Sequence, residues 1–85
     1  MPAQNQLIKV TIKNRQKVVY SGSATYVTST NEQGQFDILP FHANFITLVK
    51  DYIILDKGLQ TQQKIDIDKG LLMVMSNNVE VYAGL

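Results

Sequence analysis

The feature that most limits the fold of this chain is a period-two alternation of apolar and polar residues in short segments. In LIKVTIK, residues 7–13, isoleucine and valine alternate with lysine and threonine. That period is typical of a strand with one buried face, because successive side chains of a strand point to opposite sides. The nearest candidate for a helix, residues 42–55, is rich in aromatic and β-branched residues, which favour a strand. The sequence therefore predicts an all-β protein.

Turn signals recur between these segments at intervals of about 8–12 residues, as in an antiparallel sandwich or a small barrel. The tripeptide DKG occurs at 56–58 and at 68–70 and is interpreted as a turn in both places, because glycine accepts a positive φ. The run SNN, 76–78, is interpreted as a tight hairpin with asparagine at both central positions. The segments expected to form strands are 7–13, 17–22, 24–30, 36–39, 44–49, 52–55, 71–75 and 79–83.

The composition fits one small domain over residues 1–85, in which 45% of the residues are hydrophobic. The absence of cysteine excludes disulfides, thiolate metal sites and a cysteine nucleophile. The N-terminus lacks the pattern of a signal peptide, and no segment approaches the roughly 18 apolar residues of a membrane span. We therefore expect a soluble domain, with residues 1–6 as a flexible N-terminus. A formal net charge of +1 favours no charged partner.

Few residues are candidates for chemistry. His42 is the single histidine, and no nucleophile or acid is placed beside it by the sequence. Asp66 and Asp68 share one face of a predicted strand, but without a neighbouring histidine we favour a solvated face over a metal site. We therefore expect no enzymatic activity, no metal and no cofactor.

Two surface features leave alternatives open. Half of the cations fall in residues 9–17, which form either a solvated hairpin edge or a binding patch. Either two of the three phenylalanines, Phe36, Phe41 and Phe45, belong to the core, or they form a platform that stacks bases. We favour the solvated edge, because charged residues protect exposed strands. We favour the core for two of the phenylalanines, because all three are distant in sequence from the basic segment.

At GQFDILPFHANF, residues 34–45, the chain resembles the N-terminal domain of the epsilon subunit of the rotary ATP synthase. In that family a strand ends in Ile-Leu-Pro-x-His-Ala, which is residues 38–43 here. The resemblance extends over residues 7–83 and implies an antiparallel β-sandwich of about ten short strands. Its other matching positions are Ser21, Gly22, Gly70, Asn78, Val79 and Val81.

The resemblance implies a non-catalytic rotor subunit of an F-type ATP synthase. Such a domain binds the gamma subunit and the c ring, and it is peripheral at the cytoplasmic face of the energy-transducing membrane. It binds no nucleic acid. The positions implied to face gamma are Asn14, Phe41, His42 and Thr47. The positions implied to lie in the loop facing the c ring are Glu32, Gln33 and Gln35.

Several residues depart from the family pattern. The family usually has glycine at positions 37 and 41, proline at 44 and an acidic residue at 35, where this chain has Asp37, Phe41, Asn44 and Gln35. Phe41 places a large side chain on a surface that is usually flat. The printed sequence ends at Leu85, so we expect the helical hairpin that follows the domain in the family to be absent. Two rival functions are a stand-alone protein-interaction module and a small barrel that binds single-stranded nucleic acid.

His42 itself has two interpretations. Pro40 ends a strand because it has no N–H to donate, and the turn that follows is expected to expose His42 at one end of the domain. An exposed histidine titrates near neutral pH and could be a pH-sensitive contact. We favour the alternative, in which His42 is a turn residue that hydrogen-bonds the backbone or a partner.

Overall fold

The computed structural model describes residues 6–84, so the expectation of a flexible N-terminus lies outside the described residues for positions 1–5. Between residues 6 and 84 every element is a strand, and no helix there is long and apolar enough to cross a membrane. The strands are β1 (Ile8–Lys13), β2 (Val18–Ala24), β3 (Val27–Asn31), β4 (Gly34–Ile38), β5 (Phe45–Leu55), β6 (Gln63–Met75) and β7 (Asn78–Ala83).

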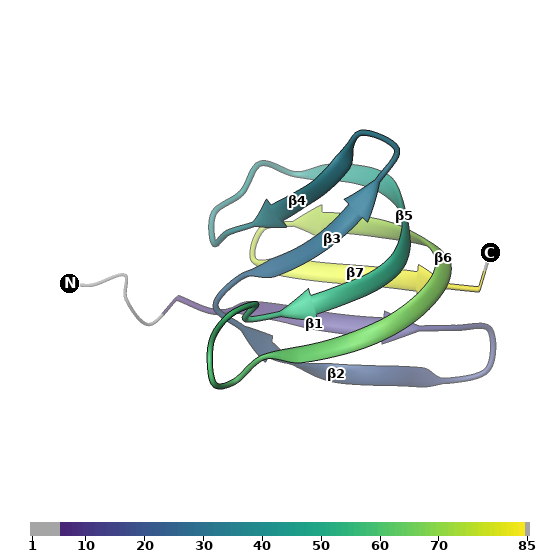
Figure 1. Cartoon of the computed structure of the whole chain (residues 1–85), viewed down its shortest axis with the longest axis horizontal. Helices are drawn as coiled ribbons and strands as arrows, with labels where there is room; N and C mark the ends of the chain where they lie inside the picture. Colours follow the sequence, from purple (N-terminus) through teal and green to yellow (C-terminus); the bar gives the residue numbers. More distant parts are fainter. Residues whose placement is uncertain (1–5, 85) are drawn as a thin grey trace.

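The strands form a continuous sheet in the order β2-β1-β7-β6-β5-β3-β4, which folds over into two layers (Figure 1). The two long strands make this possible because each contributes to both layers. Residues 45–49 of β5 pair with 70–74 of β6, which in turn pairs with β7. Residues 51–55 of β5 pair with 63–67 of β6, and residues 53–55 also pair with β3. The predicted antiparallel β-sandwich is confirmed, with one parallel pair between β1 and β7.

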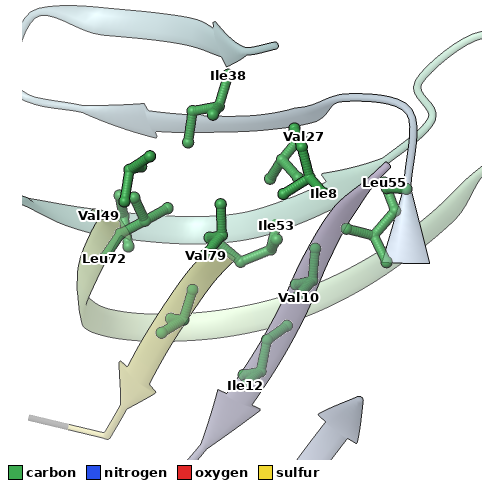
Figure 2. Close-up of a cluster of buried hydrophobic side chains, with 13 residues drawn as sticks. Ile8, Val10, Ile12, Val27, Ile38, Val49, Ile53, Leu55, Leu72 and Val79 are labelled. Carbon is green, nitrogen blue, oxygen red and sulfur yellow. The ribbon is translucent and has the colours of Figure 1, made fainter. Parts of the chain in front are cut away.

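The core lies between the two layers and consists of aliphatic side chains from all seven strands (Figure 2). The alternation in residues 7–13 has the predicted effect, since Ile8, Val10 and Ile12 of β1 are buried. Phe36 packs partly buried against this cluster and Ile38 is fully buried, also as predicted. Burial of such side chains removes apolar surface from water, which is the main force that holds the layers together.

The strand boundaries differ from the sequence prediction in three places. Residues 44–49 and 52–55 belong to one strand, β5, interrupted only by a register shift between Lys50 and Asp51. The second DKG, 68–70, is not a turn but lies inside β6. The segment 24–30 is not one strand, because the chain turns at Thr25 and Tyr26. The predicted number of strands was therefore too high, although β5 and β6 each act as two segments.

The register shifts explain why the long strands bend. A β-bulge inserts an unpaired residue and increases the local twist of the strand. Lys50 pairs with Lys69, whereas Asp51 pairs with Ile67, so Asp68 is the extra residue on β6. Asp51 has a φ of 72°, which a regular strand does not adopt. The polar segment 68–70, which was predicted to be a turn, therefore forms part of the bend between the layers.

The hairpin between β6 and β7 turns one residue earlier than expected. Met75 pairs with Asn78, so the central positions are Ser76 and Asn77 rather than two asparagines. Ser76 has the positive φ, 56°. The predicted hairpin is present, but the pair of central residues is shifted by one position.

Candidate functional site

Part of the outer surface of the sandwich, over β5 and β6, is apolar. Ile46 lies directly opposite Met73, and Leu48 lies opposite Leu71, on the side of β5 and β6 that points away from the core. Side chains of directly opposed residues share a face of the sheet. The exposed fractions of Ile46 and Leu48 are 64% and 65%. We call this surface the outer apolar face; its residues are Ile46, Leu48, Leu71, Met73 and Met75.

The sequence contains a signal for this surface that the strand analysis did not use. LLMVM, residues 71–75, is apolar without interruption, a pattern expected of strands covered on both faces. In the domain only one side is covered. Leu72 and Val74 are 0% and 1% exposed, whereas Met75 is 62% exposed. An uncovered apolar surface that spans two strands is typical of a surface that binds another protein.

A polar rim borders the outer apolar face on the side of β7 and β1. Tyr82 and Glu80 of β7 lie opposite Leu71 and Met73, and Lys13 of β1 lies beside Tyr82. The Lys13 Nζ lies 3.9 Å from the Glu80 carboxylate and 5.0 Å from the centroid of the Tyr82 ring. An apolar centre with a polar rim is the usual arrangement of a protein interface.

Phe41 and His42 lie together at one end of this sheet, beside the β6–β7 turn, and line a hollow with Ser76 and Asn77. The expectation that the turn exposes His42 is only partly met. His42 is half-buried, its ring centroid lies 4.9 Å from that of Phe45, and its Nδ1 lies 2.8 Å from the Ala43 carbonyl oxygen. Phe41 is the exposed residue of the pair, with 70% of its surface accessible.

Asn14 and Thr47 are not near that turn. Asn14 follows Lys13 in the β1–β2 turn, at the opposite end of β1 from the β6–β7 turn (Figure 1). Its Oδ1 accepts hydrogen bonds from the backbone N–H groups of Gln16 and Lys17 and so stabilises its own turn. Thr47 is half-buried on the opposite side of β5 from Ile46, where its Oγ1 accepts a 3.2 Å hydrogen bond from Asn31 Nδ2. The structure thus brings together two of the four predicted positions.

The three positions implied to face the c ring lie on one hairpin. Glu32 and Gln33 are exposed in the β3–β4 turn, and Gln35 is exposed on β4. The Gln35 Oε1 accepts a 2.9 Å hydrogen bond from the Tyr52 hydroxyl, which fixes this side chain against β5. The hairpin tip lies next to the outer apolar face, because Glu32 and Gln33 line a hollow together with Ile46 and Leu48.

The remaining candidates for chemistry do not assemble. Asp66 and Asp68 are exposed on one side of β6, and Asp66 lies 4.0 Å from the Lys64 ammonium. Within residues 6–84 no group of three or more histidine, aspartate or glutamate side chains comes together in a way that could hold a metal ion. Phe36 and Phe45 pack edge to face with centroids 6.1 Å apart and lie against the core.

The fold and this surface define a small β-sandwich with the features of a protein-binding module. Comparison with known proteins shows the family to which this module belongs. The family described as ATP synthase, Delta/Epsilon chain, beta-sandwich domain, matches residues 7–84, and the chain belongs to this family. A curated relative, the ATP synthase epsilon chain of Campylobacter lari, is 32% identical over 78 residues, which are 91% of this chain and 60% of the relative. The resemblance found in the sequence is confirmed.

Solved structures share the fold at low sequence identity. One is a chain of the Euglena gracilis mitochondrial ATP synthase, OSCP/F1/c-ring in rotational state 1, with a TM-score of 0.80 and 14% identity; the match covers 98% of this chain and 52% of that one. Another, from the Tetrahymena thermophila mitochondrial ATP synthase central stalk/c-ring structure, has a TM-score of 0.67 and 14% identity, covering 92% and 63%. This chain therefore spans less than two thirds of the length of these relatives.

Proposed function

We propose that this domain is a non-catalytic part of the central stalk of an F-type ATP synthase, where it couples rotation of the c ring to the catalytic head. The observation that carries the proposal is the outer apolar face, together with membership of the delta/epsilon family. Two neighbouring strands that present five apolar side chains to solvent need a permanent partner, because obligate interfaces are more apolar than ordinary protein surface.

In this proposal the gamma subunit covers the outer apolar face and the adjoining turn with Phe41 and His42. The polar rim of Lys13, Glu80 and Tyr82 limits the contact on one side. The family resemblance adds Asn14 and Thr47 to the gamma contact. A partner that also reaches Asn14 has to extend along the whole length of β1, since Asn14 and Phe41 lie at opposite ends of the sheet.

The c ring contacts the β3–β4 turn in the same proposal, through Glu32, Gln33 and Gln35. This turn is exposed and polar, which suits a contact that carries torque by charge and hydrogen bonding rather than by apolar burial. The proposal requires no cofactor and no catalytic residue in this chain. It places the domain at the cytoplasmic face of an energy-transducing membrane through its partners alone.

The test is complex formation between the full chain and the gamma subunit of the same organism, measured by size exclusion with light scattering. We expect a one-to-one complex for the natural sequence and its loss for Leu48→Gln, which puts a polar group in the middle of the outer apolar face. Leu59→Gln is the matched control, because Leu59 is also exposed, at 49%, but lies in the turn after β5. A stand-alone interaction module, the alternative function, predicts no complex with gamma at all.

A further inference from the structure

The turn after β4 holds a phenylalanine in a backbone conformation that favours glycine. The His42 N–H donates a 3.1 Å hydrogen bond to the Leu39 carbonyl, which closes a four-residue turn with Pro40 and Phe41 at its centre. Proline at the second position and a positive φ at the third are the features of a type II turn. The φ of Phe41 is 66°. A bulky side chain in this region is a genuine outlier, because its Cβ approaches the backbone carbonyl oxygen too closely.

Among the described residues other than glycine, a positive φ is also found at Asp51, Asp56 and Ser76. Aspartate tolerates a positive φ better than phenylalanine does, and Ser76 lies in a hairpin turn. Phe41 is different because its side chain gains nothing inside the domain. It is 70% exposed, and within residues 6–84 its ring forms no aromatic pair, unlike the rings of His42 and Phe45. The domain thus retains a strained residue that contributes nothing to its core.

The backbone of Phe41 is held in place from a second turn. Its N–H donates a 2.7 Å hydrogen bond to Asn77 Oδ1 in the β6–β7 turn. In return, the Ser76 N–H of that turn donates a 2.9 Å hydrogen bond to Asn44 Oδ1. These reciprocal bonds tie the two turns together and fix the backbone that carries an exposed aromatic ring. Fixing a side chain before binding reduces the entropy that binding has to remove.

The position of the ring indicates what it contacts. The β6–β7 turn begins at Met75, the last residue of the outer apolar face, so Phe41 extends that face at its end. Aromatic residues, phenylalanine included, are enriched in the buried centre of protein interfaces. Backbone strain that no internal contact offsets is often found at functional positions.

We infer that Phe41 is the specificity-determining anchor of the contact with the partner subunit, and that its ring enters an apolar socket on that subunit. The inference rests on the proposed function, because it takes the partner to be the subunit that covers the outer apolar face. It also predicts that a partner shaped for glycine at this position lacks the socket and binds this chain poorly.

The test compares binding with stability in the full chain. Phe41→Asn removes the ring and relieves the strain, since asparagine tolerates a positive φ. We expect its melting temperature to stay unchanged or to rise by up to about 8 °C, while its affinity for the gamma subunit, measured by calorimetry, falls at least about 30-fold. Phe41→Tyr keeps an aromatic ring and should bind within about threefold of the natural chain. Leu59→Gln, the control for an exposed apolar residue away from this surface, should bind equally well.

The outcomes separate the two proposals. If the natural chain binds gamma and Phe41→Asn binds with equal affinity, the anchor role is overturned and the proposed function stands. A clear fall in the melting temperature of Phe41→Asn would show that the ring stabilises the domain. That result would overturn the argument that Phe41 adopts an unfavourable backbone conformation without a stabilising contact inside the domain. If the natural chain forms no complex with gamma, both the proposed function and the anchor role are overturned.

Discussion

The Asp56 carboxylate holds the turn after β5 against the corner between β2 and β3. Its Oδ1 accepts hydrogen bonds from the N–H and the hydroxyl of Thr25, both 2.7 Å, and its Oδ2 accepts one of 2.7 Å from the Thr61 hydroxyl. Asp56 is buried. Burial by itself raises the pKa of this carboxyl, but the hydrogen bonds from Thr61, Thr25 and Tyr26 outweigh it, so the pKa lies below its ordinary value of 3.8.

This lowered pKa gives a prediction for stability against pH. A carboxyl whose pKa is lower in the folded state stabilises the fold when ionised, and this contribution is lost as the pH falls from 3.8 through the folded pKa. Asp56→Asn keeps the size of the side chain and tolerates the φ of 54°. We expect Asp56→Asn to reduce the free energy of unfolding by about 1–2 kcal/mol near pH 7, measured by urea denaturation.

Urea denaturation of the same two proteins at acid pH is a stricter test of the prediction. Between about pH 5 and pH 2 the natural chain should lose stability more steeply than Asp56→Asn, because the variant has no charge to lose at this position. Parallel curves for the two proteins would contradict the assignment of the acid sensitivity to Asp56. This site is only weakly indicated in the sequence, because DKG at 56–58 predicts a turn but not the hydrogen bonds from Thr61 and from the distant Thr25.

Among the elements, β6 depends on a glycine at the point where it bends. A Cβ built on Gly70 would lie 2.9 Å from the Tyr82 carbonyl oxygen and 3.3 Å from Val81 Cγ1. The first contact is with backbone, which cannot move without disturbing the pairing of β6 with β7. We expect Gly70→Ala to reduce the free energy of unfolding by about 1–3 kcal/mol, measured by thermal or urea denaturation.

Gly22 in β2 is the matched control for Gly70. The three atoms nearest to a Cβ there all belong to the far end of the Tyr20 side chain, which can shift at a lower cost than backbone. Alanine also has a lower conformational entropy in the unfolded chain than glycine. Gly22→Ala should therefore change the stability by less than about 1 kcal/mol. Equal effects of the two substitutions would show that close approach at the bend is not the reason for Gly70.

The alternation of residue types was sufficient to predict β1 and β7 but not the two long strands. β1 and β7 have one buried and one less buried side, so their period is visible in the sequence. β5 and β6 change layer midway, and the charged residues at their bends have the composition of a turn. The pairing of Lys50 with Lys69 shows that each strand continues through its bend. This pairing joins two distant segments, so neither segment predicts it alone.

The two sides of the β5–β6 pair allow a direct comparison of burial. Leu72 is fully buried, whereas Leu48 on the outer apolar face is 65% exposed. Leu72→Ala should reduce the free energy of unfolding by about 2–5 kcal/mol, because it leaves a cavity in a packed core. Leu48→Ala should change it by less than about 0.5 kcal/mol. A large loss for Leu48→Ala in urea denaturation would mean that the outer face is covered in the isolated chain.

At the scale of the whole molecule, the family pattern in the sequence predicted the fold and the family of the domain. The outer apolar face became visible only in the structure. The motif at residues 38–43 is recognisable because proline and histidine are rare in this chain. The outer apolar face is not recognisable in the same way. Its residues come from segments that are far apart, 46–48 and 71–75, and their exposure depends on which side of each strand the opposite layer covers.

The distribution of charge and aromatic rings over the molecule argues against the rival function of nucleic-acid binding. Such binding needs basic residues and exposed rings on one face. Here Arg15 and Lys17 lie in the β1–β2 turn, whereas the exposed ring of Phe41 lies at the opposite end of the sheet. Lys13 already lies beside the Glu80 carboxylate. The structure thus separates the basic β1–β2 turn from the exposed ring of Phe41.

We therefore expect no binding of a fluorescently labelled oligothymidine tighter than about 100 µM at 150 mM salt, measured by anisotropy, since dedicated binders reach or exceed this affinity through counterion release. The double variant Arg15→Gln, Lys17→Gln should give the same result as the natural chain. An affinity that falls about tenfold or more between 50 and 200 mM salt, and that the double variant loses, would contradict the expectation. In that case the basic turn, rather than the outer apolar face, would be the functional surface of the domain.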